Sequence, residues 1–215
     1  MMDRIREASP RFKARIAGAL YLLSVMTAAF TELFVRGRLN LAGGFIAVIG
    51  MIAVTLLLYG IFKPVNRSLS SFAAFLSLVG LTFEALRWQP QGLNIAVVLN
   101  GFYCLLIGYL IFRSTFLPRI LGALMAIAGF GWLTFLSPPL AHSLSPYNLA
   151  SGLLGEGSVM LWLVVMGVNV QRWKASEMAM SRQLATRAPC PKLHLQGKSE
   201  IQGPRSPCVP ARRTS

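Results

Sequence analysis

The chain carries little charge, and very little of that charge is negative. Charged residues make up 13% of its 215 residues, and only seven are acidic. An average soluble domain carries about 25% charged residues, so the composition excludes a soluble globular domain as the main part of the chain. Hydrophobic residues reach 54% and the mean hydropathy is +0.58, which is typical of a membrane protein.

Cysteine and histidine are also scarce, which limits metal and redox chemistry. There are three cysteines and two histidines. Cys104 lies inside an apolar stretch, where a free thiol behaves as a small hydrophobic side chain. Cys190 and His194 lack the second pair of ligands that a metal motif needs. The sequence also lacks a glycine-rich phosphate loop, a His-Glu-x-x-His motif and a Gly-x-Ser-x-Gly nucleophile elbow. We therefore expect no metal, no cofactor, no catalytic residue and no enzyme activity.

Apolar stretches account for most of the chain. A hydrocarbon core about 30 Å thick needs about 20 mainly apolar residues in a helix. Six stretches meet this requirement: Arg15–Phe34, Leu41–Phe62, Leu69–Arg87, Leu93–Phe112, Arg119–Leu136 and Leu149–Val170. The sequence therefore predicts an all-α, polytopic membrane protein with a bundle of six transmembrane helices. The first stretch also resembles a secretory signal, but its apolar run continues to Phe34, which favours an uncleaved helix.

Basic residues flank the apolar stretches unevenly. If the helices alternate in direction, 18 of the 21 Lys and Arg residues lie on one side, in the N-terminal tail, the turns at 63–67 and 113–119, and the C-terminal tail. The positive-inside rule then predicts that both termini are cytoplasmic. The net charge of +14 is explained by this topology, so we expect no nucleic acid as a partner. The expected partner is the lipid bilayer, with a second copy of the chain or another membrane protein as an open alternative.

The composition divides the chain into three regions. Residues 1–14 are a basic cytoplasmic tail, and residues 15–174 form the six-helix transmembrane domain. Residues 175–215 are rich in Pro, Ser, Arg and Lys, and such a segment cannot bury enough apolar surface to fold alone. We therefore expect a disordered basic cytoplasmic tail there. Within the fifth stretch, Gly122, Ala126 and Gly129 form a seam of small residues that predicts close helix packing.

Several runs of the sequence resemble one family of bacterial multi-pass membrane proteins, the domain-of-unknown-function family 4386. These runs are Arg15–Leu23, Phe34–Leu39, Lys63–Leu69, Tyr103–Ser114 and Phe116–Gly122. The resemblance covers about residues 12–173, and its most specific part joins the fourth and fifth stretches. The segment after Arg38 looks shorter than is usual for the family. The resemblance implies an integral protein of the bacterial cytoplasmic membrane without an assigned activity, and it supplies no catalytic residue.

Acidic residues inside the apolar stretches are the most informative polar positions. A carboxylate at the bilayer centre costs at least about 2.5–3.5 kcal/mol, so such a residue points to a function by default. With the N-terminus inside, all the carboxylates within the stretches fall in the outer half, and Glu156 lies about 10 Å below the outer boundary at 1.5 Å per residue. The candidate polar or ion site comprises Glu156, Glu84, Glu32 and Asn100.

A structural explanation competes with this site. Arg36 and Arg87 are candidate counter-ions, because Glu32 and Glu84 each have one of them within a helical turn. Glu156 has no cation within a turn of its own helix. It must pair with Arg87 across helices, accept hydrogen bonds from Asn100 or Tyr103, or stay protonated.

Three functions stay open from the sequence. The outer carboxylates favour a small transporter, a channel or an ion-responsive membrane protein. The missing motifs are equally compatible with a non-catalytic membrane component that packs with partner proteins or lipids. An intramembrane enzyme acting on a lipid or a quinone is the third alternative, although no nucleophile or metal set accompanies the carboxylates.

Overall fold

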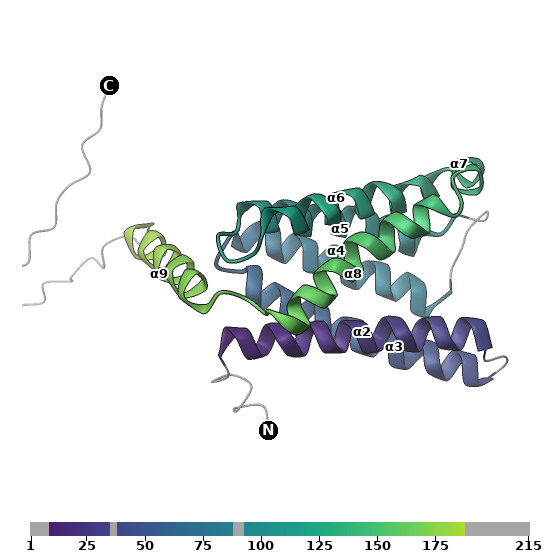
Figure 1. The fold of residues 1–215 in the computed structure, drawn as a ribbon, viewed down its shortest axis with the longest axis horizontal. Helices are drawn as coiled ribbons and strands as arrows, with labels where there is room; N and C mark the ends of the chain where they lie inside the picture. The colour runs from purple at the N-terminus through teal and green to yellow at the C-terminus, as the bar shows by residue number, and fades with distance from the viewer. Residues whose placement is uncertain (1–8, 35–37, 88–92, 188–215) are drawn as a thin grey trace, which may run out of the picture.

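Helices make up every regular element of the computed structural model, which describes residues 9–34, 38–87 and 93–187 (Figure 1). The long helices are α2 (Pro10–Phe34), α3 (Arg38–Phe62), α4 (Arg67–Ala85), α5 (Ile95–Arg113), α6 (Arg119–Leu133), α8 (Tyr147–Val165) and α9 (Val170–Arg187). A 3-10 turn, η2 (Thr134–Leu136), and a short helix, α7 (Pro138–Ser143), connect α6 to α8. Six of the helices are long and apolar enough to cross a membrane, as the sequence predicts.

The ends of two spans differ from the expected boundaries, and local residues explain why. Helix α2 begins at Pro10, because proline suits the first helical position and the Ser9 hydroxyl accepts a hydrogen bond from the backbone N–H of Phe12 at 3.4 Å. Helix α8 ends at Val165, five residues before the expected end. The reason is Gly167, whose φ of +68° is a left-handed conformation that ends helices and that glycine adopts without strain.

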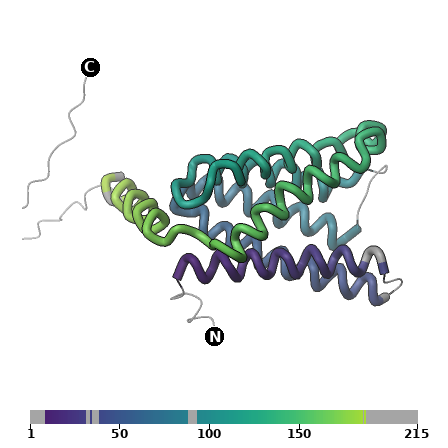
Figure 2. Tube along the Cα trace, in the orientation of Figure 1, coloured from purple at the N-terminus to yellow at the C-terminus, as the bar shows by residue number. Residues whose placement is uncertain are grey.

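The six spanning helices form a closed ring in chain order. Each helix packs on the next, from α2 through α3, α4, α5 and α6 to α8, and α8 packs back on α2. Figure 2 shows that α8 runs diagonally, from α2 at one end of the bundle to the side of α6 and α7 at the other. We call the end where α2 begins and α8 ends the basic end, and the opposite end the α7 end.

Paired glycines bring α5 and α6 into backbone contact. A Cβ atom added to Gly108 would lie 2.9 Å from the carbonyl oxygen of Gly122, and one added to Gly101 would lie 3.0 Å from that of Gly129. Small residues of this kind let helices approach closely in a membrane, where packing rather than the hydrophobic effect drives association. The small-residue seam predicted from Gly122 and Gly129 is therefore at the α5–α6 interface.

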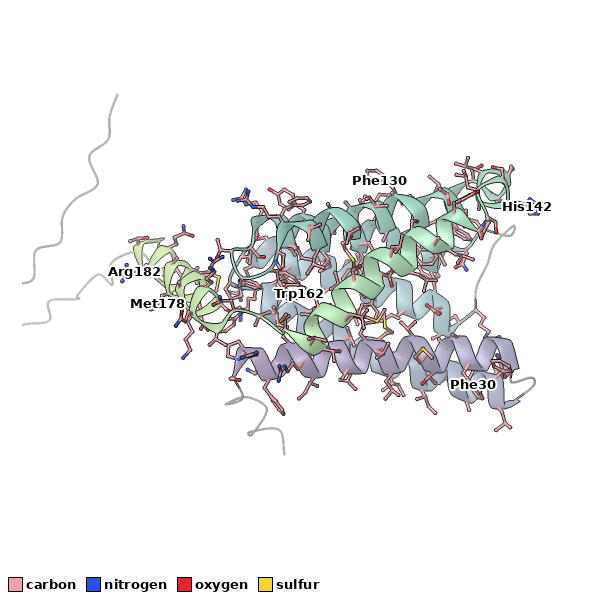
Figure 3. All side chains as sticks on the ribbon, in the orientation of Figure 1. Phe30, Phe130, His142, Trp162, Met178 and Arg182 are labelled. Atoms are coloured by element: carbon pink, nitrogen blue, oxygen red, sulfur yellow. The ribbon has the colours of Figure 1, made fainter. Side chains whose placement is uncertain are left out.

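The apolar core fills the half of the ring nearest the basic end. Its most buried large side chains are Tyr21, Val54, Phe62, Leu110, Ile111, Met125 and Leu163. On the outside of the ring, large apolar side chains such as Phe30 and Phe130 are exposed (Figure 3). Such a surface suits contact with lipid, since a water-soluble protein rarely exposes large continuous apolar patches.

Helix α9 corrects the expected boundary of the disordered tail. Residues 175–187 were expected to be disordered, but they continue the helix that begins at Val170. The Asn169 side chain accepts a hydrogen bond from the backbone N–H of Arg172 at 3.2 Å, and the Trp173 indole donates to the Ile61 carbonyl at 3.0 Å. A capped first turn and many strong helix formers explain the helix. Residues 188–215, the rest of the expected tail, lie outside the described residues.

The glycine contacts lead to a first prediction. Gly108→Ala should lower the midpoint of thermal unfolding in detergent, because overpacking a close interface typically costs about 1–3 kcal/mol. Gly60→Ala is the matched control, since a Cβ at Gly60 meets no atom within 4 Å. Its midpoint should stay unchanged or rise, because alanine is the better helix former. Equal midpoints for the two variants would contradict the assigned interface.

Candidate functional site

Glu156 occupies the centre of the ring and receives hydrogen bonds from three other helices. Its carboxyl Oε1 accepts from the Trp132 indole at 2.6 Å, from the Asn100 amide at 2.9 Å and from the Cys104 thiol at 3.4 Å. Its Oε2 accepts from the Tyr21 hydroxyl at 2.7 Å. Trp132 lies on α6, Asn100 and Cys104 lie on α5, and Tyr21 lies on α2. Glu156 itself is only 9% exposed. All four donors are uncharged groups, so among the described residues this carboxyl group is held in an apolar bundle by hydrogen bonds from neutral side chains.

Glycine at position 152 allows the tryptophan to reach the carboxyl group. Gly152 lies one helical turn before Glu156 on α8, and a Cβ atom there would come within 2.3 Å of the Trp132 ring. The indole therefore lies directly against the bare α8 backbone at Gly152. Gly131 on α6 faces Ser151 in the same manner, with a Cβ distance of 1.9 Å to the serine Oγ. The local sequence thus sets the close α6–α8 approach that aims the indole N–H at the carboxyl oxygen.

A cavity of about 510 Å³ opens beside this carboxyl group, in the half of the ring toward the α7 end. Its lining comes from all six spanning helices and includes Glu156, Asn100, Trp132 and Glu84. Apolar and small residues such as Met51 supply most of the remaining wall. The volume lies within the range of about 300–1,000 Å³ that is usual for small-molecule sites. A largely apolar chamber with a few convergent polar groups is the general form of a ligand site.

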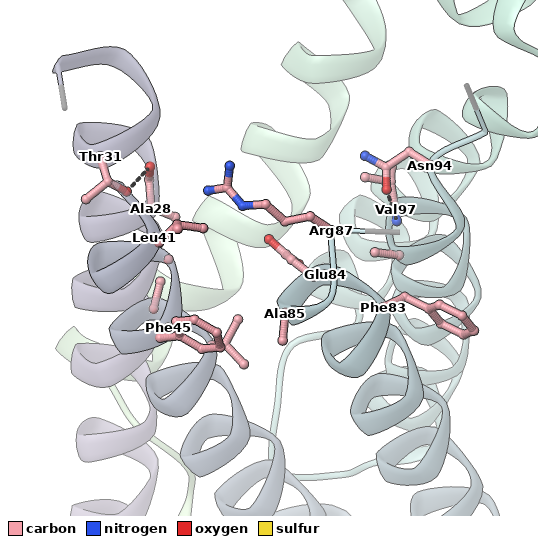
Figure 4. A pocket seen from close by; sticks show the side chains of 14 residues that line it. Ala28, Thr31, Leu41, Phe45, Phe83, Glu84, Ala85, Arg87, Asn94 and Val97 are labelled. Atoms are coloured by element: carbon pink, nitrogen blue, oxygen red, sulfur yellow. Dashed lines mark hydrogen bonds between the residues drawn. The ribbon is translucent and has the colours of Figure 1, made fainter. Parts of the chain in front are cut away.

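A second cavity, with two charged residues in its lining, lies at the α7 end. This cavity, of about 390 Å³, shares Ala28, Ala47 and Glu84 with the first, and Arg87 also lines it. Figure 4 shows the Glu84 carboxyl and the Arg87 guanidinium directed into this space. Arg87 donates a hydrogen bond to the Asn40 side chain on α3. The two cavities therefore adjoin one another, with ionisable groups at the outer one and Glu156 deeper inside.

Only some of the predicted site residues lie together in the structure. Asn100 contacts Glu156 directly, and Glu84 lines the same cavity from the end of α4. Glu156 is the middle residue of α8, about 14 Å from the first residue at 1.5 Å per residue, which is deeper than the sequence suggested. Arg36 lies outside the described residues, as does the side chain of Glu32.

Two of the expected partners of Glu156 do not contact it. Arg87 donates to Asn40 at the α7 end and is not among the groups bonded to Glu156. Tyr103 is buried nearby but does not donate to the carboxyl group in the described structure. His142 is exposed on α7, at the end of the bundle (Figure 3). Among the described residues, no cluster of three or more His, Cys, Asp and Glu could hold a metal ion.

Sequence reasoning missed three of the four donors. The sequence suggested only a small hydrophobic side chain for Cys104, and it pointed to neither Trp132 nor Tyr21 as a partner of Glu156. A usable signal was present for two of them, because a buried tryptophan or tyrosine normally finds a partner for its polar atom. Glu156 is one of only three carboxylates within the apolar stretches, and carboxylates are strong acceptors.

Comparison with known proteins adds a family but no activity. Residues 81–167 match the model of a family described as a domain of unknown function, DUF4386. This segment is similar to that family. The resemblance found in the sequence is thereby confirmed for residues 81–167, and the DUF4386 segment contains Glu156 with three of its donors, whereas Tyr21 precedes it.

One curated relative is described as uncharacterized. An uncharacterized protein of Archaeoglobus fulgidus is 26% identical over 139 residues, which cover 60% of this chain and 83% of the relative. The relative is archaeal, so similarity to this chain extends beyond the bacterial proteins that the sequence resembled. No solved structure matches the chain. Together with six candidate spans, the DUF4386 match indicates a membrane protein of uncharacterised family.

Truncating the central carboxyl group provides the second prediction. Glu156→Ala removes the acceptor of the Trp132 and Tyr21 donors, and each unsatisfied buried donor costs about 1–3 kcal/mol. The free energy of unfolding in a detergent–denaturant titration should fall accordingly. Glu177→Ala, on the exposed surface of α9, should change it by less than about 0.5 kcal/mol. Similar losses for both variants would show that the hydrogen bonds to Glu156 contribute little.

Proposed function

We propose that this protein binds a small cation in the cavity, with Glu156 as the carboxylate that holds it, as the first step of transport or of an ion-dependent response. The observation that carries the proposal is a buried carboxyl group that lines a cavity of about 510 Å³ and contacts only uncharged donors among the described residues. A carboxylate without a resident counter-ion is a natural place for a mobile one.

The distribution of the donors supports the same function. Oε1 receives three hydrogen bonds, whereas Oε2 receives one, from Tyr21. A carboxylate offers about four acceptor positions over its two oxygens, and each oxygen has two lone pairs. Oε2 therefore retains acceptor capacity for a ligand. Asn100, which also lines the cavity, adds a side-chain carbonyl oxygen on the same wall.

The packed half of the ring argues against an open pore. The core residues near the basic end include Phe62, Leu110 and Ile111, each at most 1% exposed. In this conformation the cavity opens in the half toward the α7 end and is closed on the basic-end side of Glu156. A site closed on one side supports a carrier or a sensor, in which release to the other side requires a conformational change.

A purely structural role for Glu156 is the competing candidate. Its hydrogen bonds join α8 to α2, α5 and α6, and polar groups can hold membrane helices together in this manner. The two roles predict different results for an isosteric substitution. Glu156→Gln keeps an acceptor oxygen for the donors but removes the charge, so a structural role requires no change in cation binding.

Cation binding supplies the third prediction. Purified protein reconstituted in liposomes should bind and take up methylammonium, and Glu156→Gln should weaken binding by about 10- to 100-fold, because a charge-assisted hydrogen bond contributes about 1.5–3 kcal/mol. Sodium, potassium and proton flux should be measured in the same preparation. Glu177→Gln, a matched carboxylate on α9, should behave as the unsubstituted protein. Equal affinities for the two variants would exclude Glu156 as the cation ligand.

We also propose that the basic end faces the cytoplasm and that the protein resides in a cytoplasmic membrane. Support comes from Arg15, Lys63, Arg113 and Arg172, which all lie at or near that end, since the positive-inside rule relates such loops to the cytoplasm. The proposed role is non-enzymatic. Its expected surroundings are lipid, with a second copy of the chain or a membrane partner as an addition, and without nucleic acid.

The orientation can be tested with cysteine labelling. In a variant with its native tail cysteines replaced by serine, Ala175→Cys on α9 should react with a membrane-impermeant maleimide only after cells are opened. Ser143→Cys on α7 should react in intact cells, because both positions are exposed in the structure and lie at opposite ends of the bundle. The reverse pattern would place the basic end outside, and labelling of both positions in intact cells would reject the six-span arrangement.

A further inference from the structure

Helices α2 and α8 touch near the basic end and separate toward the α7 end. Near the basic end, a Cβ on Gly18 would lie 2.8 Å from the Val164 backbone nitrogen, and Arg15 donates to the Val165 carbonyl at 2.9 Å. Beyond Glu156, the close contacts of α8 are with α6 instead, as between Gly152 and Trp132. Figure 1 shows the same course, with α8 leaning away from α2 as it approaches α7.

The cavity reaches the outside of the ring where these two helices part. Its lining includes Ala29 on α2 and Leu149 and Leu153 on α8. These residues belong to the exposed surface, since Leu153 is 66% and Leu149 46% exposed, and Ala29 is exposed as well. A side opening between spanning helices faces lipid rather than water. We call this opening, bounded by Ala29, Leu149 and Leu153, the lateral portal.

We propose that the ligand is an organic ammonium ion with an apolar body, which enters from the bilayer through the lateral portal and places its ammonium group on Glu156. This inference rests on the proposed function and names its substrate class. The opening faces hydrocarbon, the walls are mainly apolar, and the carboxyl group lies at the inner end of the cavity. Each of these features matches one part of such a molecule.

The oxygen ligands at this site suit an organic ammonium ion better than a hydrated inorganic ion. Calcium takes six to eight oxygen ligands and magnesium a nearly ideal octahedron, whereas the carboxyl oxygens here are largely occupied by protein donors. An ammonium group needs only one or two acceptors, such as Oε2 of Glu156 and the carbonyl oxygen of Asn100. Burial of its apolar body is favourable only where that surface leaves water, so a ligand already in lipid relies on the carboxylate for specificity.

The same chemistry has two sources in a membrane. One is a free lipophilic amine, and the other is a phospholipid with an amine headgroup. Both have an ammonium group on an apolar body. An experiment can distinguish them by changing the lipid composition of the membrane. Nanodiscs made from phosphatidylcholine alone contain no primary amine, whereas nanodiscs with phosphatidylethanolamine do.

The experiment uses the full chain in nanodiscs and a brominated long-chain alkylamine as the probe. Bromine quenches tryptophan fluorescence at short range, and Trp132 lines the cavity. Saturable quenching is expected, about tenfold or more weaker in Glu156→Gln, and it should be lost in Trp132→Phe. Ala29→Phe should slow the onset of quenching by narrowing the lateral portal. Ala42→Phe is its matched control, because Ala42 is exposed on α3 and does not line the cavity.

The outcomes separate this inference from the function on which it rests. If methylammonium binding depends on Glu156 but the brominated alkylamine gives no Glu156-dependent quenching, the apolar substrate class is wrong and the cation site stands. If neither depends on Glu156, both proposals fail. Equal onset rates for Ala29→Phe and Ala42→Phe would reject entry through the lateral portal. Competition by phosphatidylethanolamine would identify the lipid headgroup as the source, and its absence would favour a free amine.

Discussion

A carboxyl group can stay inside an apolar helix bundle only if its oxygens find hydrogen-bond donors, and this requirement shapes the middle of the molecule. Glu156 has no cation within a turn on α8, and its acceptors are satisfied by an indole, an amide, a thiol and a phenol from α6, α5 and α2. Because each bond fixes a helix at short range, the geometry of this group constrains where four of the six spanning helices meet.

The hydrogen bonds lie at a boundary between two kinds of interior. On the side of the basic end, side chains such as Phe62 and Ile111 fill the ring, and the Gly108–Gly122 pair brings the α5 and α6 backbones together. On the other side, α8 follows α6 and leaves α2, and the interior is hollow. Both halves follow from the same diagonal course of α8. A helix parallel to its neighbours would have closed the cavity and covered the carboxyl group.

How far the sequence predicts this structure depends on which interaction decides each feature. The spans follow from the length of apolar runs, and the close packing of α6 follows from Gly122 and Gly129, because both are properties of one segment. The contact between Asn100 and Glu156 could be expected, because both are polar residues within apolar stretches. Trp132 and Tyr21 could not be assigned as donors, since a helical period does not specify which helices face each other. Helix α9 was not predicted, because its low mean hydropathy is typical of a disordered tail even though it contains strong helix formers. The capping role of Asn169 was not predicted either.

The two interpretations of Glu156 need not exclude one another. Three of the hydrogen bonds that join helices are accepted by Oε1 and one by Oε2, so the structural demand falls mainly on one oxygen. The other oxygen has only the Tyr21 hydroxyl, a group that can rotate to donate elsewhere or accept from a ligand. A cation that binds at Oε2 would therefore act directly on the link between α2 and α8. These two helices bound the cavity, so occupancy of the site and the separation of α2 from α8 would be coupled through a single carboxyl group.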